Sequence, residues 1–443
     1  MDNRPALTLV PPVAPDPALD SWSARRLLPG GPVTFPLVGL GDPRPAPGLE
    51  AHLAELGLRP GPHTADDLVG RVAASELTGR GGGHFPVARK WRAVQAATER
   101  TGVLPLVVAN GSEGEPASAK DAALLCHRPH LVLDGLAQAA AAVRATESVL
   151  WLHGDAHTAH RAVVRALEER RASGLVETPV RLATGPSRYL SGESSAVVRA
   201  LSGGPALPES RRVPTATSGV DGRPTLVQNV ETLARVGLLA RTGVGAHHPT
   251  SLVTVVVAGW RTVLEVEPGV TVSQALALGG WPADVDPQAV LVGGYGGSWV
   301  AFDAVRDLPL TETSMRRAGL SLGAGVLAPL PAHACGVAEV ARLAAYLARA
   351  GARQCGPCLF GLGALSTTLT ELARGAGRRS DVRRLLGWAA EVTGRGACHH
   401  PDGAVRMVLT GLTTFAADVE AHRRGRPCPG AGTPGVLPVP AEP

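Results

Sequence analysis

The sequence predicts a multidomain α/β protein, and three observations lead to this prediction. The chain has 443 residues, enough for roughly two to four compact units, and 44% of them are hydrophobic, enough for sizeable cores. Up to about residue 245, apolar runs alternate with stretches of helical periodicity, as in a parallel sheet covered by helices. A compact β-rich segment follows, and residues 335–424 have helical periodicity throughout.

The expected elements follow in chain order. Residues 1–45 are rich in proline and glycine and predict an extended arm, and residues 425–443 predict a flexible tail for the same reason. Between them we expect an α/β domain over 46–245, a β-rich module over 246–315 and a helical domain over 330–424. Within these domains the patterns predict strands at 104–110, 148–154 and 178–185, and helices at 48–76, 120–146, 157–173 and 273–279.

Composition excludes several classes of protein. The formal net charge is +5, but the arginines are scattered and aromatic residues make up only 3%, which argues against nucleic-acid binding. The chain contains no long apolar run and begins without a signal-peptide pattern, so neither a membrane span nor secretion is expected. Six cysteines are too few for a disulfide framework, which favours a reducing compartment such as the cytoplasm.

The residue types that are scarce mark the informative segments. Isoleucine is absent, the only lysines are Lys90 and Lys120, and the only asparagines are Asn3, Asn110 and Asn229. A lysine that persists among so many arginines is a candidate for a role that a planar guanidinium cannot fill. Both lysines, and two of the asparagines, lie in the segments that look most like functional motifs.

A glycine-rich loop, TGRGGGHFPVARKW, spans residues 78–91. Its glycines let backbone N–H groups approach an anion closely, and the helix that follows adds a favourable dipole. A phosphate or a flavin phosphate is the ligand that this pattern favours. The alternative is a surface loop in a glycine-rich chain.

Three polar segments follow predicted strands or begin helices. The segment NGSEGEP directly follows the strand at 104–110, where ligands of parallel sheets bind, so Asn110, Ser112, Glu113 and Glu115 are expected to line a site. Lys120 is expected to support a carboxylate there. RYLSGESSAVV (188–198) and TLVQNVETLA (225–234) each start or interrupt a helix-like pattern and carry Glu193 and Glu231. Each of these two, taken alone, is typical of a helix cap.

The cysteines predict one metal site. Cys355 and Cys358 have C-x-x-C spacing, and Cys398 is followed by His399 and His400. This pattern is compatible with an iron–sulfur cluster, with a zinc ion held by three cysteines and one histidine, or with a vestigial site. The remaining cysteines, Cys126, Cys335 and Cys428, are expected to be buried apolar residues or incidental.

Taken together and in this order, these motifs resemble the family of NADH-binding, FMN-carrying subunits of respiratory complex I and its relatives in NAD-linked hydrogenases and formate dehydrogenases. The resemblance covers residues 70–422 and rests on GRGGGHFPVARKW, NGSEGEP, YLSGES, QNVETLA and QCGPC with Cys398. It implies a Rossmann-like FMN-binding domain, a ubiquitin-like β-grasp (SLBB-type) module and a C-terminal helical iron–sulfur domain.

The resemblance also implies site residues. Those expected at the FMN are Gly79, Arg80, Gly81, Gly82, Lys90, Asn110, Ser112, Glu113, Tyr189, Gly192, Glu193, Asn229 and Thr232. Phe85 and Glu115 are expected to help hold the dinucleotide, and Cys355, Cys358, Cys398 and His399 to hold a cluster, 4Fe–4S by analogy. The implied chemistry is hydride transfer from NAD(P)H to the flavin, followed by single-electron transfer to the cluster.

This sequence departs from the family pattern at four positions. Ser112 replaces an acidic residue, Ser194 replaces the second carboxylate of an elbow, and His84 replaces a loop glycine. Ala352 stands where the first cysteine of a C-x-x-C-x-x-C motif is expected. Three alternatives follow: the fourth cluster ligand comes from elsewhere, the cluster has three irons, or there is no cluster.

The resulting hypothesis is an NAD(P)H dehydrogenase-type oxidoreductase that passes electrons through FMN and a cluster to a small carrier such as ferredoxin. The protein is not expected to insert in a membrane, and a hetero-oligomer is one option for its assembly. The net charge of +5 suits an acidic carrier. Two alternatives stay open: a relay or scaffold flavoprotein that has lost dinucleotide binding, and a zinc-stabilised ligand-binding protein.

Overall fold

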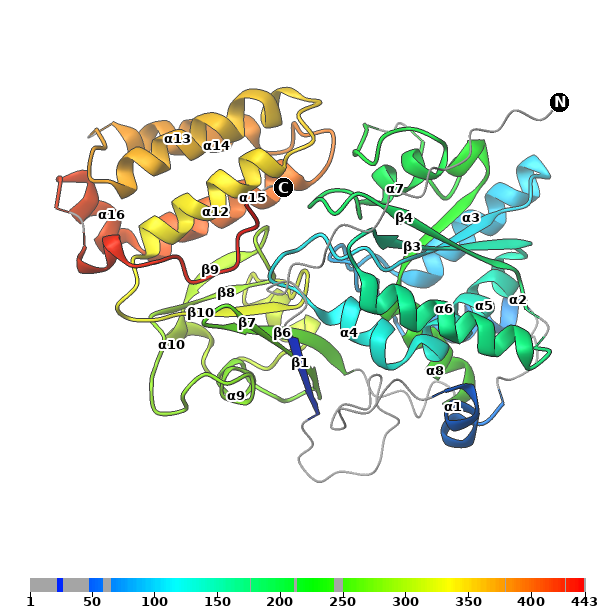
Figure 1. Ribbon diagram of the computed structural model, residues 1–443. Helices are drawn as coiled ribbons and strands as arrows, with labels where there is room; N and C mark the ends of the chain where they lie inside the picture. Colours follow the sequence, from blue (N-terminus) through cyan, green and yellow to red (C-terminus); the bar gives the residue numbers. More distant parts are fainter. Residues whose placement is uncertain are drawn as a thin grey trace.

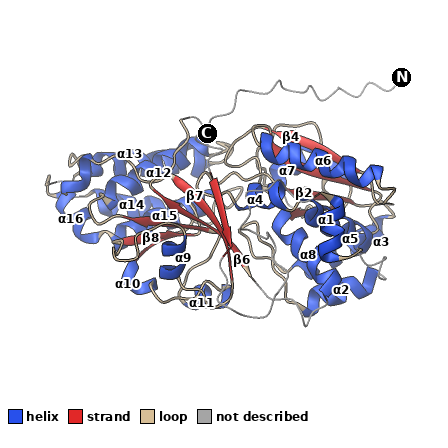
Figure 2. Cartoon of the chain, turned by 60° about the horizontal axis from the view of Figure 1, so that its bottom comes forward, coloured by secondary structure: helices blue, strands red, loops and turns tan. Residues whose placement is uncertain are grey.

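The structure is a computed structural model that describes residues 22–26, 48–58, 65–175, 177–210, 213–242, 250–378, 380–426 and 428–441. It contains two separate sheets and a bundle of helices (Figure 1). The four-stranded sheet belongs to the α/β domain, and the six-stranded sheet lies between that domain and the helices of the C-terminal region (Figure 2). The predicted α/β class with a parallel sheet and a helical C-terminal region is confirmed. No helix in the described residues is both long and apolar enough to cross a bilayer.

The first sheet is fully parallel, in the order β4-β3-β2-β5. Its strands are β2 (Leu106–Asn110), β3 (Glu147–His153), β4 (Val180–Gly185) and β5 (Thr225–Asn229). Three of them match the expected strands. The fourth strand, β5, was not expected, because the apolar run at 226–227 is too short for its period to be recognised.

Helices cover both faces of this sheet because side chains alternate between the faces along each strand. Val107, Ala109 and Leu150 point into a core that is shared with helices α2, α3, α5 and α8, while Val108 and Val149 pack against α7. The helices of this domain are α1 (Leu49–Leu56), α2 (Ala65–Ala74), α3 (Val87–Thr101), α4 (Lys120–His127), α5 (Pro129–Val143), α6 (His157–Ala172), α7 (Ser194–Leu201) and α8 (Val230–Thr242). The single helix expected over 120–146 is divided because Pro129 starts a new one.

The parallel register brings two motifs to one edge. Asn110 ends β2, Asn229 ends β5, and the two residues are register partners across the ladder. Both asparagines therefore lie at the carboxyl end of the sheet, where ligands of such folds bind.

The second sheet has the order β1-β7-β6-β10-β8-β9. Its strands are β1 (Trp22–Arg26), β6 (Ser251–Val257), β7 (Trp260–Val266), β8 (Ala289–Val292), β9 (Ser298–Ala301) and β10 (Val326–Leu330), with α9 (Val272–Leu278), α10 (Phe302–Val305) and α11 (Glu312–Arg317) beside them. Strand β10 lies in the middle of the sheet, so the module extends past the expected boundary at residue 315. The expected N-terminal arm lies outside the described residues except for β1, which pairs in parallel with β7.

The helical region packs on one face of this second sheet. It comprises α12 (Gly336–Ala350), η3 (Pro357–Gly361), α13 (Leu362–Ala373), α14 (Asp381–Val392), α15 (His400–Thr414) and α16 (Ala416–Arg423). Trp299 of β9 packs edge-on against Phe415, with ring centroids 5.4 Å apart, and both residues belong to one continuous core.

The expectation of a flexible tail is not met by the described residues 428–441. Leu437 is buried in the core of the helical region, and its backbone N–H donates to Glu339 over 2.9 Å. Arg342 donates to the Leu437 carbonyl over 2.7 Å, and the hydroxyl of Tyr295 donates to the carbonyl of Pro438. The tail is held by these specific contacts, which its proline- and glycine-rich composition does not reveal.

Candidate functional site

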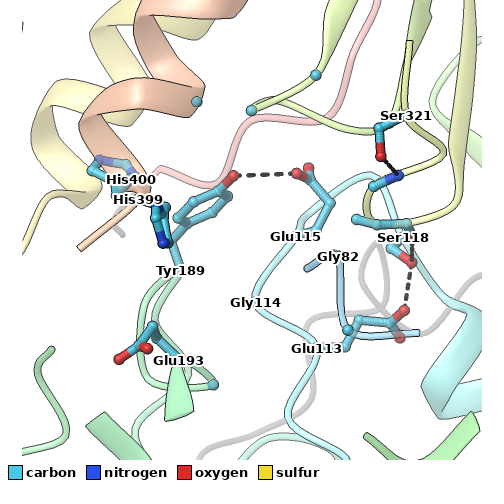
Figure 3. Close-up of a pocket in the computed structure, with 18 of the residues that line it drawn as sticks. Gly82, Glu113, Gly114, Glu115, Ser118, Tyr189, Glu193, Ser321, His399 and His400 are labelled. Carbon is cyan, nitrogen blue, oxygen red and sulfur yellow. Dashed lines mark hydrogen bonds between the residues drawn. The ribbon is translucent and has the colours of Figure 1, made fainter. Parts of the chain in front are cut away.

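A cavity of about 520 Å³ opens at the carboxyl end of the parallel sheet (Figure 3). Its walls come from the glycine loop, the acidic segment after β2, the elbow before α7, the end of β5, two loops of the second sheet and the start of α15. The expected site residues that line it are Arg80, Gly81, Gly82, Asn110, Ser112, Glu113, Glu115, Tyr189, Gly192, Glu193, Asn229 and His399. Four segments far apart in the sequence therefore converge on one cavity.

The glycine loop is fastened to α8 and to its own far end. The backbone N–H of Arg80 donates to Thr232 Oγ1 over 2.9 Å, and the N–H of Gly79 donates to the Phe85 carbonyl over 2.9 Å. Gly82 has φ +90°, a backbone conformation that favours glycine. Gly79 and Thr232 thus shape the loop without lining the cavity.

Two buried polar atoms at the cavity have no partner. They are Nε of Arg80 and Oγ of Ser112, and both residues line the cavity. Burial, with the charge of Arg235 as the second cause, lowers the pKa of Arg80 to about 10. Buried polar groups are nearly always hydrogen-bonded, so these two atoms indicate that a polar ligand belongs in the cavity.

The two asparagines tie neighbouring segments together. Asn110 Nδ2 donates to the Gly192 carbonyl over 2.7 Å, and its Oδ1 accepts from the Ser112 N–H over 3.2 Å. Asn229 Nδ2 donates to Asp121 over 2.7 Å, while its Oδ1 accepts from the Glu231 N–H over 2.9 Å. Each amide holds two backbone segments at the edge of the cavity.

The acidic segment uses its two glutamates differently. Glu113 Oε1 accepts from Ser118 Oγ over 2.5 Å and from the Asp121 N–H over 3.2 Å, and so caps the start of α4. Glu115 accepts from the Tyr295 N–H over 2.8 Å and from the Tyr189 hydroxyl over 3.3 Å. Burial raises the pKa of Glu115 to about 7.

The elbow before α7 packs directly on the acidic segment. A Cβ added to Gly114 would lie 2.1 Å from the Tyr189 carbonyl oxygen, and one added to Gly192 would lie 2.7 Å from the Ser112 carbonyl oxygen. Glycine is therefore required at both positions for the two segments to meet. Glu193 lines the cavity and also caps α7 by accepting from the Ser195 N–H over 2.8 Å.

The two lysines have different environments. Lys120 lines the cavity and forms a buried ion-pair network, with Nζ 2.6 Å from Asp121 and 3.2 Å from Glu231. Lys90 does not line the cavity: its Nζ donates to the Val227 carbonyl over 2.5 Å. Burial lowers the pKa of Lys90 to about 8, against the opposing influence of Glu193.

Phe85 lies apart from the cavity. Its side chain is 51% exposed, and Arg89 lies over its ring at 5.4 Å from the centroid. Of the two residues expected at the dinucleotide, only Glu115 lines the cavity. Ser194 begins α7 and does not line it either.

The three predicted cluster cysteines lie near one another and near the cavity wall. Burial and the neighbouring thiols of Cys355 and Cys398 raise the pKa of Cys358 to about 11. Burial raises the pKa of Cys398 too, and the charges of Glu193 and Cys355 act in the same direction. The donor set fits a cluster with three thiolate ligands, and the expected fourth sulfur is missing at Ala352.

The two histidines after Cys398 point to different places. The His400 side chain is buried, and its Nε2 lies 2.9 Å from the Leu347 carbonyl oxygen, so that hydrogen bond competes with any metal. His399 is fully exposed at the mouth of the cavity, with Nδ1 3.8 Å from Asp402 Oδ2. The assignment of His399 as a ligand stays a prediction.

The structure also places residues in the cavity wall that the sequence patterns did not indicate. Ser321, Gly293, Gly296 and Arg406 line it from the second sheet and from α15. The run GGYGGS at 293–298 lies within the expected β-rich module, and its glycines are a signal for close backbone approach. Gly293 and Gly294 have φ of +95° and +92°, and Gly294 lies against the Glu115 carboxylate.

The arrangement suits a flat, anionic, heteroaromatic ligand. Backbone N–H groups of a glycine loop and an arginine suit a phosphate, while amides and carboxylates suit ring edges and hydroxyls. The volume, the two unpartnered atoms and the glycine contacts fit FMN.

Comparison with known proteins gives matches over most of the chain. The family model described as the Nuo51 FMN-binding domain matches residues 72–238, and that of the NADH-ubiquinone oxidoreductase-F iron-sulfur binding region matches residues 338–422. The NADH-quinone oxidoreductase-F protein of Salmonella typhimurium is 30% identical over 400 residues, covering 84% of this chain and 86% of the relative. That of Streptomyces coelicolor is 28% identical over 382 residues, covering 82% and 84%.

A solved structure has a similar fold. A chain of an NAD+-reducing NiFe-hydrogenase in the H2-reduced state superposes with a TM-score of 0.74 at 25% identity, covering 85% of this chain and 67% of the other.

Proposed function

Because this chain belongs to the NADH-quinone oxidoreductase-F family, we propose that its cavity holds FMN, that FMN takes electrons from NADH, and that the cluster at Cys355, Cys358 and Cys398 passes them on. As a family member the chain is an NADH dehydrogenase-type oxidoreductase with FMN and iron–sulfur cofactors.

One observation carries the proposal: the glycine loop, the ends of β2 and β5, and the elbow before α7 line one cavity that leaves Arg80 Nε and Ser112 Oγ without partners. When bound, FMN supplies a group that accepts a hydride and releases electrons one at a time. The chain contributes binding and placement. Gly81 and Gly82 let the ligand approach the backbone closely, and the guanidinium of Arg80 offsets the negative charge of the ligand.

Glu193 relates the cavity to the cluster cysteines. It lines the cavity, and its charge also acts on Cys398. The cluster site is therefore adjacent to the wall of the proposed flavin site, as an electron path between the two cofactors requires.

An anaerobic absorption spectrum of the full chain, recorded before and after addition of NADH, tests the proposal. We expect flavin bands before the addition, bleaching of these bands by NADH, and broad iron–sulfur absorption beneath them. A protein that contains no flavin and does not take up FMN would contradict the assignment of the cavity. Flavin that dithionite reduces but NADH does not would contradict only the dehydrogenase step.

For the acceptor we propose a small acidic one-electron carrier of the ferredoxin type. The chain has a net charge of +5, and Arg353 and Arg395, close in sequence to Cys355 and Cys398, are exposed. Opposite charges on two partners raise the rate at which they meet, and salt screens the effect. A hetero-oligomeric partner that covers the same surface is the other assembly compatible with this proposal.

Charge reversal next to the cluster tests this acceptor. We expect Arg395→Glu to slow reduction of an acidic ferredoxin several-fold at low salt and to weaken the salt dependence, leaving reduction of ferricyanide by NADH unchanged. Arg161→Glu, an equal change on an exposed position of α6 in the α/β domain, serves as the control. Equal effects of the two variants would contradict docking at the cluster.

The relay alternative rests on a specific observation. Glu115, expected at the dinucleotide, already accepts hydrogen bonds from Tyr295 and Tyr189, and Phe85 lies away from the cavity. A relay protein would contain flavin that NADH does not bleach, so the same spectrum decides between the two functions.

For location we propose the cytoplasm. All six cysteines lie in the described residues and none is in a disulfide, as in a reducing compartment.

A further inference from the structure

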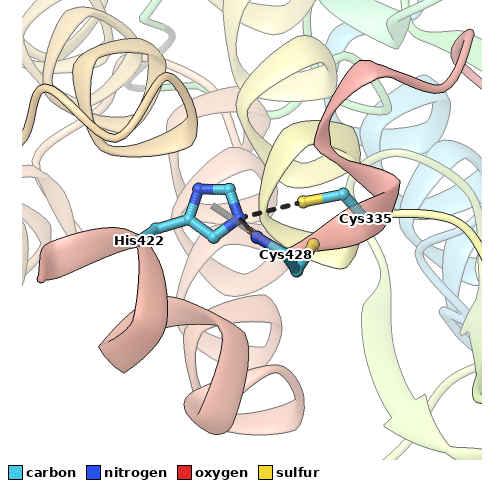
Figure 4. Close-up of side chains that lie close together, drawn as sticks. All are labelled: Cys335, His422 and Cys428. Carbon is cyan, nitrogen blue, oxygen red and sulfur yellow. Dashed lines mark hydrogen bonds between the residues drawn. The ribbon is translucent and has the colours of Figure 1, made fainter. Parts of the chain in front are cut away.

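A second group of metal-ligating side chains lies in the helical region (Figure 4). None of its members lines the cavity. Cys335 precedes α12, His422 lies in the last turn of α16, and Cys428 lies in the C-terminal tail. Their ligand atoms all lie within 4.8 Å of one another, and Cys335 Sγ is 3.4 Å from His422 Nε2. The sequence patterns alone predict that both cysteines are apolar or incidental.

We propose that Cys335, His422 and Cys428 bind a structural zinc ion, with the fourth position taken by water. Zn–S bonds of about 2.3 Å and Zn–N bonds of about 2.0 Å place tetrahedral ligands roughly 3.4–3.8 Å apart. The separation of Cys335 Sγ and His422 Nε2 falls in this range.

The histidine is already oriented for this role. Its Nδ1 lies 3.3 Å from the Leu372 carbonyl oxygen, which fixes Nδ1 as the protonated nitrogen and leaves Nε2 as an acceptor facing the two cysteines. His422 is fully buried and Cys335 is 3% exposed, so little water competes for the ion. Without an ion, two donors, the Cys335 thiol and the Cys428 N–H at 3.2 Å, converge on this one lone pair.

Binding exchanges two protons for one ion. Two thiols lose their protons to solvent, two Zn–S bonds and one Zn–N bond form, and no atom is oxidised or reduced. The ion would join three segments: the loop before α12, the end of α16 and the tail. The tail approaches that loop closely, since a Cβ on Gly430 would lie 2.4 Å from the His333 carbonyl oxygen.

This site differs from the cluster site in its geometry. Each thiolate of a 4Fe–4S or 3Fe–4S cluster binds a different iron, so the thiolate sulfurs lie farther apart than the ligands of a single ion. Only the group of Cys335, His422 and Cys428 has three ligand atoms this close among the described residues.

Metal analysis of the purified full chain, grown with zinc and iron, tests the proposal. We expect about one zinc per chain in the wild type, its loss in Cys428→Ser and in His422→Gln, and its retention in Cys126→Ser. Cys398→Ser is the second control, because zinc that occupies the cluster site by mistake would be lost there. X-ray absorption at the zinc edge is expected to show two sulfur ligands.

The proposal is overturned if the wild type contains no zinc even after incubation with Zn²⁺, or if zinc persists in both ligand variants. It is also overturned if zinc is lost in Cys398→Ser, or if freshly purified protein contains a disulfide between Cys335 and Cys428. Circular dichroism shows whether each variant folds. If a variant does not fold, the wild type is treated with a chelator instead. A fall in its melting temperature that Zn²⁺ reverses supports the zinc site, and an unchanged melting temperature contradicts it.

Discussion

The contact between the acidic segment and the elbow before α7 gives the sharpest test of the flavin site. In Gly114→Ala, the new Cβ would lie 2.1 Å from the Tyr189 carbonyl oxygen, whereas real Cβ contacts are essentially never under 3.0 Å. The two segments must therefore separate by roughly 1 Å. Because the obstructing atom belongs to the backbone, no side-chain rotation can relieve the contact.

The size of the effect follows from the strain. Overpacking of this kind costs about 1–3 kcal/mol. In the free protein, separation of the two segments relieves much of it, but binding FMN needs both at their native spacing, so the strain reappears in the binding free energy. At about 1.4 kcal/mol per tenfold change, the Kd for FMN is expected to rise about 5- to 150-fold.

Titration of the apoprotein with FMN, followed by quenching of flavin fluorescence, measures this change. Gly70→Ala is the matched control, because Gly70 is an exposed residue of α2 with no atom within 4 Å of an added Cβ. It should bind FMN as the wild type does and gain about 0.5–1 kcal/mol of stability. A folded Gly114→Ala protein with wild-type FMN affinity would refute the idea that these two segments grip the flavin.

Three further predictions concern charged groups and thiols at the site. Lys120→Met leaves the buried Glu231 carboxylate without one of its cations. In urea titrations this substitution should lower the free energy of unfolding of the flavin domain by about 3–5 kcal/mol, and a loss under about 1 kcal/mol would contradict a structural ion pair. The pKa of Glu115 is raised to about 7, so the folded protein holds this proton more tightly than the unfolded chain, and stability should fall as pH rises from about 5 to 8. Glu115→Gln should reduce this pH-dependent fall in the melting temperature. An unchanged pH dependence in the variant would contradict the assignment of the fall to Glu115. Cys398→Ser should remove the iron and keep FMN, by metal and flavin analysis, whereas Cys126→Ser should keep both; full retention of iron in Cys398→Ser would disprove the ligand assignment.

The sequence was informative about the site where rare residue types coincided with strand ends. Asn110 and Asn229 stand out by their scarcity, and the structure makes them register partners beside the cavity. The loop of residues 293–298 lies within the expected β-rich module, and nothing in its local sequence indicates that it reaches Glu115 in the cavity wall.

Features that depend on distant contacts could not be predicted. Strand β5 has only a short apolar run, and the tail has a composition typical of loops, although Leu437 is buried. Cys335 and His422 are 87 residues apart, so their proximity depends on how α12 and α16 pack. Local periodicity reports on elements of secondary structure, and it does not report on which elements meet.

The anchored C-terminal segment has a practical consequence for anyone who shortens this protein. A version cut after Arg424 would deprive Glu339 of its two backbone donors at Val436 and Leu437 and uncover an apolar surface on α12. The same cut would remove the acceptor of the Tyr295 hydroxyl, and Tyr295 is the residue whose N–H holds Glu115. Shortening at the periphery would thus affect the wall of the cavity, and expression boundaries should extend through residue 441.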